Sequence, residues 1–171
     1  MTTPTWDIYE AATPRDLEQV RALFLEYAED LGWDLASGGR FADEMEDLPG
    51  PYAQPAGTLL LACVDDVPAG VLGLQPVPED VRIPGIGAER FGELKRLFVR
   101  PGYRRLGIAR VLMKRSEAEA RTRDYEALVL TTSSEMMPLA QALYNELGYC
   151  PTEPYRTDMP WPGIKWLRLD L

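Results

Sequence analysis

The chain has 171 residues, a net charge of −9 and no histidine. Its hydrophobic content of 46% and charged content of 26% are ordinary for a soluble globular protein, so we expect one domain over residues 1–171. The negative charge disfavours nucleic-acid binding, which requires a basic surface. It is compatible with cationic amine substrates and equally with a surface that keeps the protein in solution. Without histidine or a Cys-x-x-Cys pair, no metal is expected.

The sequence gives no sign of a membrane segment or a targeting segment. No apolar run approaches the ~20 residues that span a bilayer, and the N-terminus lacks a basic stretch followed by an apolar one. We therefore expect a cytoplasmic protein without a membrane partner. Cys63 and Cys150 are expected to be free thiols, the usual condition in that compartment. A homodimer is compatible with the sequence, which does not determine the oligomeric state.

The first half of the chain predicts a strand, a long helix and a hairpin. Residues 6–11 alternate as a short strand. Thr13, Pro14 and Asp16 then supply an N-cap, a proline at the first helical position and the acid of a capping box. Apolar residues at helical spacing continue to about Gly32. Beyond this helix the pattern predicts a short acidic helix over 41–48, strands over 57–64 and 69–76, and a loop over 77–92.

Residues 93–113 form the most informative stretch of the second half. An apolar, β-prone run is broken by Pro101-Gly102 and followed by two arginines and a glycine, and a helix is expected from near Arg105 to about Asp124. The unpaired N–H groups and positive dipole at a helix start suit a phosphate or pyrophosphate. The remaining elements are a strand over 127–131 that forms a parallel βαβ unit, a helix ending at 148, and a final strand over 164–171.

Two motifs in this half resemble those of one family. Residues 104–109, Arg-Arg-Leu-Gly-Ile-Ala, fit Arg/Gln-x-x-Gly-x-Gly/Ala and resemble the acetyl-coenzyme A motif of the GCN5-related N-acetyltransferase (GNAT) family. Residues 140–149 resemble its later motif, in which Tyr144 is the tyrosine near the coenzyme sulfur. The resemblance spans about 93–149. It implies the GNAT fold, an α/β (α+β) mixed sheet, mostly antiparallel with one parallel pair at the coenzyme site and flanked by helices.

The resemblance also implies acetyl-CoA as co-substrate. In the family, backbone amides of such a loop take the pyrophosphate, and the preceding strand carries a bulge that lets the pantetheine arm lie beside it. Here the apolar positions Leu94, Leu97 and Val99 break the period of two, as a bulge would. The residues expected at the coenzyme are Leu97, Phe98, Val99, Arg104, Arg105, Leu106, Gly107, Ile108, Ala109, Arg110, Thr131 and Tyr144.

Acetyl transfer from a thioester to an amine needs a neutral amine, a partner for the oxyanion and a proton for the departing thiolate. Without histidine, carboxylates, a tyrosine or water must serve. We expect Glu93 to be the base, with Glu89 as the second candidate, although an ion pair with Lys95, Arg96 or another surface charge is an equally good interpretation of Glu93. Tyr144 is the expected acid, and core packing is its alternative role. The oxyanion would meet a backbone N–H near Leu97 or Phe98.

One departure from the family pattern bears on the function. Met137 stands where many members have an asparagine, so Thr131, Thr132 or Ser133 would replace its contact. The sequence predicts an N-acetyltransferase that moves an acetyl group from acetyl-CoA to a primary amine of an unidentified small molecule or peptide by direct transfer. The alternative is an acyl-CoA-binding regulatory module without turnover. A nucleotide-binding α/β protein is disfavoured, because neither a P-loop nor a Gly-x-Gly-x-x-Gly after the first strand occurs.

Overall fold

The computed structural model describes residues 5–35, 38–78, 81, 83, 87, 90–156 and 161–171. Within these residues, strands form one sheet in the order β1-β2-β3-β4-β5-β7-β6. The strands are β1 Trp6–Glu10, β2 Thr58–Val64, β3 Val67–Pro76, β4 Phe91–Val99, β5 Ala127–Ser133, β6 Cys150–Pro151 and β7 Ile164–Asp170. The α-helices are α1 Pro14–Asp30, α2 Arg40–Glu46, α3 Ile108–Thr122 and α4 Pro138–Glu146. Short 3₁₀ turns occupy Gly50–Tyr52 and Pro101–Tyr103.

The strand pairing confirms the predicted mixed sheet. β4 and β5 run parallel, and every other strand pair in the described part of the chain is antiparallel. The parallel pair needs a crossover, which α3 supplies. No described helix combines the length and the apolar character needed to cross a membrane.

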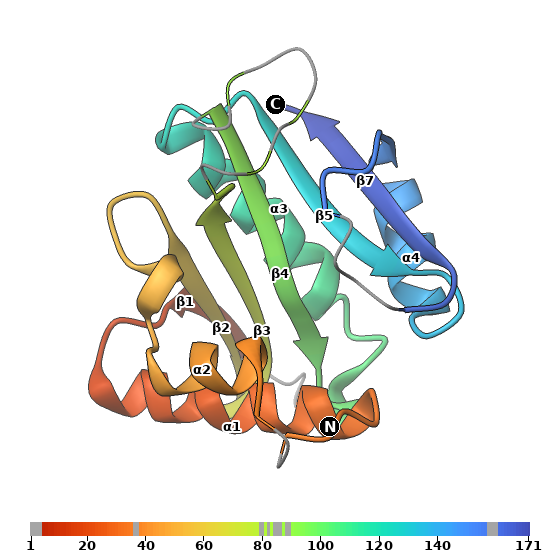
Figure 1. Cartoon of the computed structure of the whole chain (residues 1–171). Coiled ribbons are helices and arrows are strands. Elements are labelled where there is room, and N and C mark those ends of the chain that lie inside the picture. Colours follow the sequence, from red (N-terminus) through yellow and green to blue (C-terminus); the bar gives the residue numbers. More distant parts are fainter. Residues whose placement is uncertain are drawn as a thin grey trace.

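Helices cover both faces of the sheet, so the central strands are buried on both sides. Figure 1 shows α1 and α2 on one side of the sheet and α3 on the other. In β2, Leu59 and Leu61 join the core beneath α1 and α2, whereas Leu60 and Ala62 join the core beneath α3 and α4. This alternation explains why β2 reads as a continuous apolar run.

The start of α1 follows the sequence prediction closely. Thr13 Oγ1 accepts a hydrogen bond from the Asp16 N–H at 3.2 Å, and Asp16 Oδ2 accepts one from the Thr13 N–H at 2.9 Å. These reciprocal bonds complete the capping box. The same helix buries Phe24 and Tyr27 against the sheet, which places Tyr27 close to the site described below.

The β2–β3 hairpin is tighter than the sequence pattern indicates. Its turn consists of Asp65 and Asp66, both with positive φ (47° and 64°), so β3 begins already at Val67. Such a two-residue turn matches the twist of the paired strands. Cys63 near this turn is buried and Cys150 is exposed, and both are free thiols as predicted.

Candidate active site

The parallel strands β4 and β5 separate after a short region of pairing. Phe91–Glu93 pair with residues 127–129, and the ladder then stops; Figure 1 shows the two strands diverging beyond this point. The cause lies in β4. Its register against β3 shifts between Val71 and Gly73, and Arg96 has a φ of 63°. The predicted bulge is therefore confirmed, and it turns β4 away from β5.

A small cavity of about 30 Å³ lies where the two strands part. It brings together side chains from β4, β5, α1 and α4, among them Leu97, Thr131 and Tyr144, which the sequence predicts to act at one site. The full lining is Tyr27, Leu72, Leu94, Lys95, Arg96, Leu97, Met113, Leu130, Thr131, Thr132, Met137 and Tyr144.

The N-terminus of α3 leaves its first-turn N–H groups without a side-chain cap. Gly107 is the N-cap, with a φ of 83°, and a Cβ built on it would meet nothing within 4 Å. The left-handed backbone requires glycine there, and the space in front of the helix is open. The helix starts at Ile108, later than predicted, because the positive φ of Arg105 (66°) is incompatible with a helical turn. An uncapped start is suited to an anion.

The arginines of this loop have different surroundings. Arg104 Nε donates to the Val99 carbonyl at 2.9 Å, and its Nη2 donates to Asp30 at 3.1 Å, so this side chain ties the loop to β4 and α1. Arg110 pairs with Glu146 on α4. Among the described residues, Arg105 has no side-chain partner and is exposed, so of the three it is the one most available to a phosphate.

Tyr144 contributes a hydroxyl to the cavity from α4. The residue is 7% exposed, and its ring packs on Tyr149 with centroids 6.0 Å apart. Burial raises the pKa of Tyr144 above its ordinary value, and the nearby Tyr27 hydroxyl raises it further. The phenol therefore stays protonated at neutral pH, as a proton donor must.

The three hydroxyl residues at the end of β5 are not equivalent. Thr131 Oγ1 donates to the Tyr155 hydroxyl at 3.1 Å, and Ser133 Oγ donates to the Pro162 carbonyl at 2.6 Å. Thr132 Oγ1 is buried at the cavity with no hydrogen-bond partner among the described residues. A buried hydroxyl without a partner is costly, so Thr132 is the better candidate for a ligand contact than Thr131.

Met137 fills its position differently from an asparagine. It precedes α4 as the N-cap residue and forms no side-chain cap, and its sulfur accepts a hydrogen bond from the Tyr27 hydroxyl at 4.0 Å. The thioether thus supplies no amide to the cavity, and the unpartnered hydroxyl of Thr132 is the candidate substitute on β5.

Glu93 lies inside the protein, in an ion pair. It is 1% exposed; Arg156 donates from Nε to Oε1 at 2.9 Å and from Nη2 to Oε2 at 2.8 Å. Gln75 Nε2 donates to Oε2 at 2.8 Å. The carboxylate is therefore paired, as one interpretation of the sequence has it, although the partner is a distant arginine rather than Lys95 or a neighbouring charge. Glu89 lies outside the described residues.

A line of hydroxyl groups connects Glu93 to the cavity. Thr131, which lines the cavity, donates to the Tyr155 hydroxyl, and Tyr155 donates to Glu93 Oε1 at 3.5 Å. Burial and the Glu93 charge raise the pKa of Tyr155 above its ordinary value, so this hydroxyl stays protonated. This line of hydroxyl groups could not be predicted, because Tyr155 falls in a stretch without a motif.

A second buried ion pair is formed by Arg96, the residue after Lys95 in β4, and Glu44. Arg96 donates from Nε and Nη2 to the Glu44 carboxylate at 3.0 and 2.7 Å. Its guanidinium carbon lies 4.4 Å from the ring centroid of Phe41 and 5.7 Å from that of Trp33. This arrangement fixes Arg96 at the bulge, a role that the sequence does not reveal because Glu44 comes from the separate helix α2.

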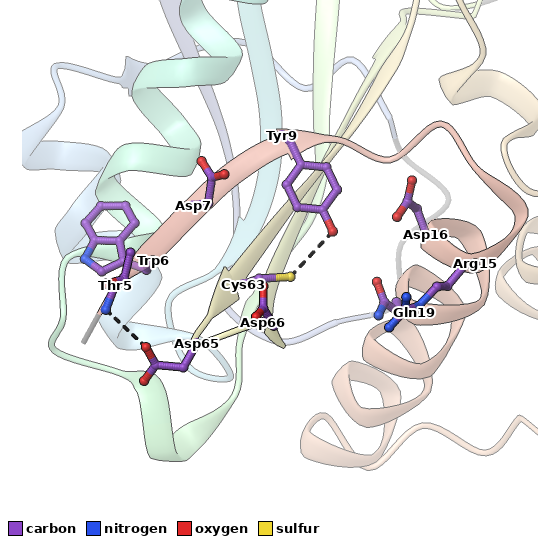
Figure 2. A pocket seen from close by; sticks show the side chains of 10 residues that line it. All are labelled: Thr5, Trp6, Asp7, Tyr9, Arg15, Asp16, Gln19, Cys63, Asp65 and Asp66. Atoms are coloured by element: carbon purple, nitrogen blue, oxygen red, sulfur yellow. Dashed lines mark hydrogen bonds between the residues drawn. The ribbon is translucent and has the colours of Figure 1, made fainter.

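A larger hollow lies elsewhere, at the open edge of the sheet. Its volume is about 730 Å³. Figure 2 shows its residues on β1, the β2–β3 turn and the start of α1. Within it the Tyr9 hydroxyl lies 3.6 Å from the Cys63 thiol, and the Thr5 N–H donates to Asp65 at 3.2 Å. None of the residues in the two sequence motifs lines it. The candidate active site is therefore the smaller cavity between β4 and β5.

A mixed sheet that opens at a bulged strand, beside an uncapped helix start, is the architecture expected from the acetyltransferase motifs of the sequence. The match to known families agrees with it. The chain belongs to the Acetyltransferase (GNAT) family, whose model matches residues 17–149.

Two relatives named as N-acetyltransferases also support membership of this family. The chain is 31% identical to an uncharacterized N-acetyltransferase of Schizosaccharomyces pombe, with 92% of this chain and 90% of the relative covered. It is 26% identical to another from Dictyostelium discoideum, with 91% and 94% covered. A GNAT-family acetyltransferase structure from Staphylococcus aureus superposes with a TM-score of 0.73 at 19% identity, covering 97% of this chain and 99% of that one, which supports the fold.

Proposed function

We propose that this protein transfers an acetyl group directly from acetyl-CoA to a primary amine of a small molecule or peptide. The observation that carries the proposal is the position of Tyr144, whose protonated hydroxyl shares one cavity with the bulged segment of β4. A proton donor and unpaired strand backbone at one point are what acyl transfer from a thioester requires.

The coenzyme-binding part of the proposal rests on the loop before α3. The first-turn N–H groups of Ile108, Ala109 and Arg110 would hold the pyrophosphate, with Arg105 beside them. Backbone groups of Leu97, Phe98 and Val99 would hold the pantetheine arm, and Thr132 would donate to it from β5. These residues fit such a ligand because the space at Gly107 is open and the Thr132 hydroxyl has no partner in the described chain.

Acetyl-CoA would supply the acyl group as a thioester. Tyr144 holds its proton at neutral pH and is the acid for the departing thiolate. The backbone N–H groups near Leu97 are released from β5 by the strand separation, and they stabilise negative charge that develops on the acyl oxygen. No ionised side chain is needed for that task.

The base in this proposal is Glu93, acting through hydroxyl groups rather than directly. The amine proton passes to Thr131, the Thr131 proton to Tyr155, and the Tyr155 proton to Glu93, in the direction in which these groups already donate. Arg156 and Gln75 hold the carboxylate at the end of this line. This relay explains how a carboxylate that does not line the cavity can serve it.

A second candidate function is an acyl-CoA-binding module without turnover. The observation that favours it is that the Glu93 carboxylate is held inside the protein by Arg156 and Gln75 and does not line the cavity. The variant Tyr144→Phe distinguishes the two functions. In a catalyst, Tyr144→Phe keeps acetyl-CoA binding and lowers turnover about 10²–10⁴-fold; in a binding module there is no turnover to lower.

The experiment that tests the proposal incubates the purified protein with acetyl-CoA and a broad panel of primary amines. Free CoA should be read by chromatography, because the exposed Cys150 thiol would react with a thiol reagent. Release of CoA that depends on both the protein and an amine supports the proposal. Tight acetyl-CoA binding in calorimetry without any release would contradict it in favour of the binding module.

A further inference from the structure

Lys95 is the one charged group at the cavity whose partner is not found in the described part of the chain. Four charged side chains lie close enough to Lys95 to act on it electrostatically and form a group of five with it: Arg96, Arg156, Glu44 and Glu93. Each carboxylate takes a bidentate arginine, Glu44 with Arg96 and Glu93 with Arg156. No described carboxylate oxygen lies within 4.0 Å of the Lys95 ammonium. The group of five therefore carries one uncompensated positive charge.

The surroundings of Lys95 make that charge costly. The side chain is half-buried and lines the cavity. Burial lowers the pKa of Lys95 below its ordinary value, the Arg96 charge lowers it further, and the attraction of Glu93 and Glu44 does not restore it. Buried charges in proteins are normally paired. An anion in the cavity would supply the pair.

The two arginines are less suited to bind such an anion. Arg96 is held by Glu44 and by the rings of Phe41 and Trp33, and Arg156 is held by Glu93. Binding a ligand through either would break a buried ion pair, which is strongly unfavourable. Lys95 has no such bond to give up.

Lys95 also lies at the right place for an acceptor. It directly precedes the bulge residue Arg96, and it shares the cavity with Thr131 and Tyr144. An anionic group bound at Lys95 would hold the rest of its molecule beside the groups proposed to move protons. The net charge of −9 favours an acceptor that carries an ammonium group. The local positive charge of Lys95 adds the requirement that the same acceptor also carries an anionic group.

We propose that Lys95 binds a carboxylate of the acceptor, so that the acetylated molecule carries its primary amine and a carboxylate together, as an amino acid does. This inference rests on the proposed acetyl transfer and names its substrate class. Lys95 is then a specificity residue: it positions the acceptor through its carboxylate and takes no part in moving the acyl group.

The test compares matched acceptors that differ in the carboxylate alone. One set is L-leucine, L-leucinamide and 3-methylbutylamine, and further sets repeat the comparison with aromatic, polar and acidic side chains. Two readouts are taken: kcat/KM from CoA release, and binding of each compound without acetyl-CoA by calorimetry. The proteins are the wild type, Lys95→Met and Lys95→Arg, with Lys114→Met and Lys165→Met as controls at the other two lysines of the chain.

In at least one set the carboxylate should raise kcat/KM and affinity in the wild type over the amide and the amine. Lys95→Met should reduce that preference about 10- to 100-fold, the worth of a hydrogen bond to a charged group. Lys95→Arg should keep part of it, and the two control variants should keep all of it.

The inference is overturned if amines are acetylated with no preference for a carboxylate in any set, or if Lys95→Met leaves the preference unchanged. An equal loss of kcat/KM for every acceptor in Lys95→Met would also overturn the inference, since that result indicates a structural role for Lys95. Failure of the proposed function looks different, because then no compound releases CoA. In that case the binding readout decides: carboxylate binding that Lys95→Met abolishes supports the inference, and its absence contradicts it.

Discussion

Glu93 on β4 and Arg156 in the segment before β7 form a bidentate ion pair inside the protein, with N–O distances of 2.9 and 2.8 Å. The two side chains are 2% and 9% exposed. Gln75 and Tyr155 donate to the same carboxylate. This pair joins the parallel part of the sheet to the C-terminal segment, directly beside the candidate active site.

Removing one member of this pair should be costly for folding. Arg156→Met leaves the Glu93 carboxylate buried without its cation, and we expect the free energy of unfolding to fall by about 3–5 kcal/mol. Urea denaturation measures it. Arg115→Met is the matched control, because the Arg115–Glu119 pair is partly exposed on α3 and should cost less than about 1 kcal/mol. Equal, small losses of unfolding free energy in both variants would show that the buried pair contributes no more to stability than the exposed pair.

Tyr155→Phe tests the proton relay without removing the Glu93–Arg156 ion pair. It removes the hydroxyl between Thr131 and Glu93 and keeps the ring and the Arg156 contacts. We expect kcat to fall about 10²-fold or more, within the range for general acid–base catalysis, with acetyl-CoA affinity unchanged. Tyr9→Phe, which removes a hydroxyl in the distant hollow of Figure 2, is the control. If Tyr155→Phe turns over like the wild type, water rather than Glu93 accepts the amine proton.

Thr132→Val tests the unpartnered hydroxyl of β5. The change keeps the shape of the side chain and deletes a buried polar group with no partner in the described chain, so stability should not decrease. The affinity for acetyl-CoA should fall about 3- to 10-fold, as for the loss of one neutral hydrogen bond. Thermal denaturation and calorimetry measure the two effects. Ser133→Ala, which loses an existing bond to Pro162, should show the opposite pattern.

The Glu44–Arg96 pair makes stability depend on pH in the acid range. Burial alone would raise the pKa of Glu44, but the hydrogen bonds and charge of Arg96 outweigh it, and the pKa lies below its usual 4.5. A carboxyl whose folded pKa is depressed adds stability above its unfolded pKa and loses it as the pH falls through the folded value. Glu44→Gln should therefore flatten the fall in unfolding free energy below pH 4.5, whereas Glu18→Gln, at an exposed position on α1, should not. Parallel curves for all three proteins would contradict this.

Local chemistry made much of the fold predictable. The capping box of Thr13 and Asp16 depends on residues three apart, and the bulge leaves its trace in the spacing of Leu94 and Leu97. Gly107 could be predicted at the turn before α3, where its φ of 83° is one that glycine adopts readily. Each of these features is encoded within a few neighbouring positions.

The site's polar partners could not be predicted in the same way. Arg156 is 63 residues from Glu93 and lies in a stretch with no motif, so only the folded chain brings the two together. Thr131 and Thr132 point to opposite faces of β5, and which hydroxyl is satisfied depends on Tyr155. Glu44, whose charge acts on Lys95, comes from α2 in the other half of the chain.

We propose above all that the cavity between β4 and β5 catalyses acyl transfer. The most direct measurement compares wild type and Tyr144→Phe in one preparation, with acetyl-CoA affinity from calorimetry and CoA release from chromatography in the presence of the amine panel. We expect equal affinities and turnover about 10²–10⁴-fold lower in the variant. Equal turnover in the two proteins, or acetyl-CoA binding without amine-dependent CoA release in the wild type, would contradict it.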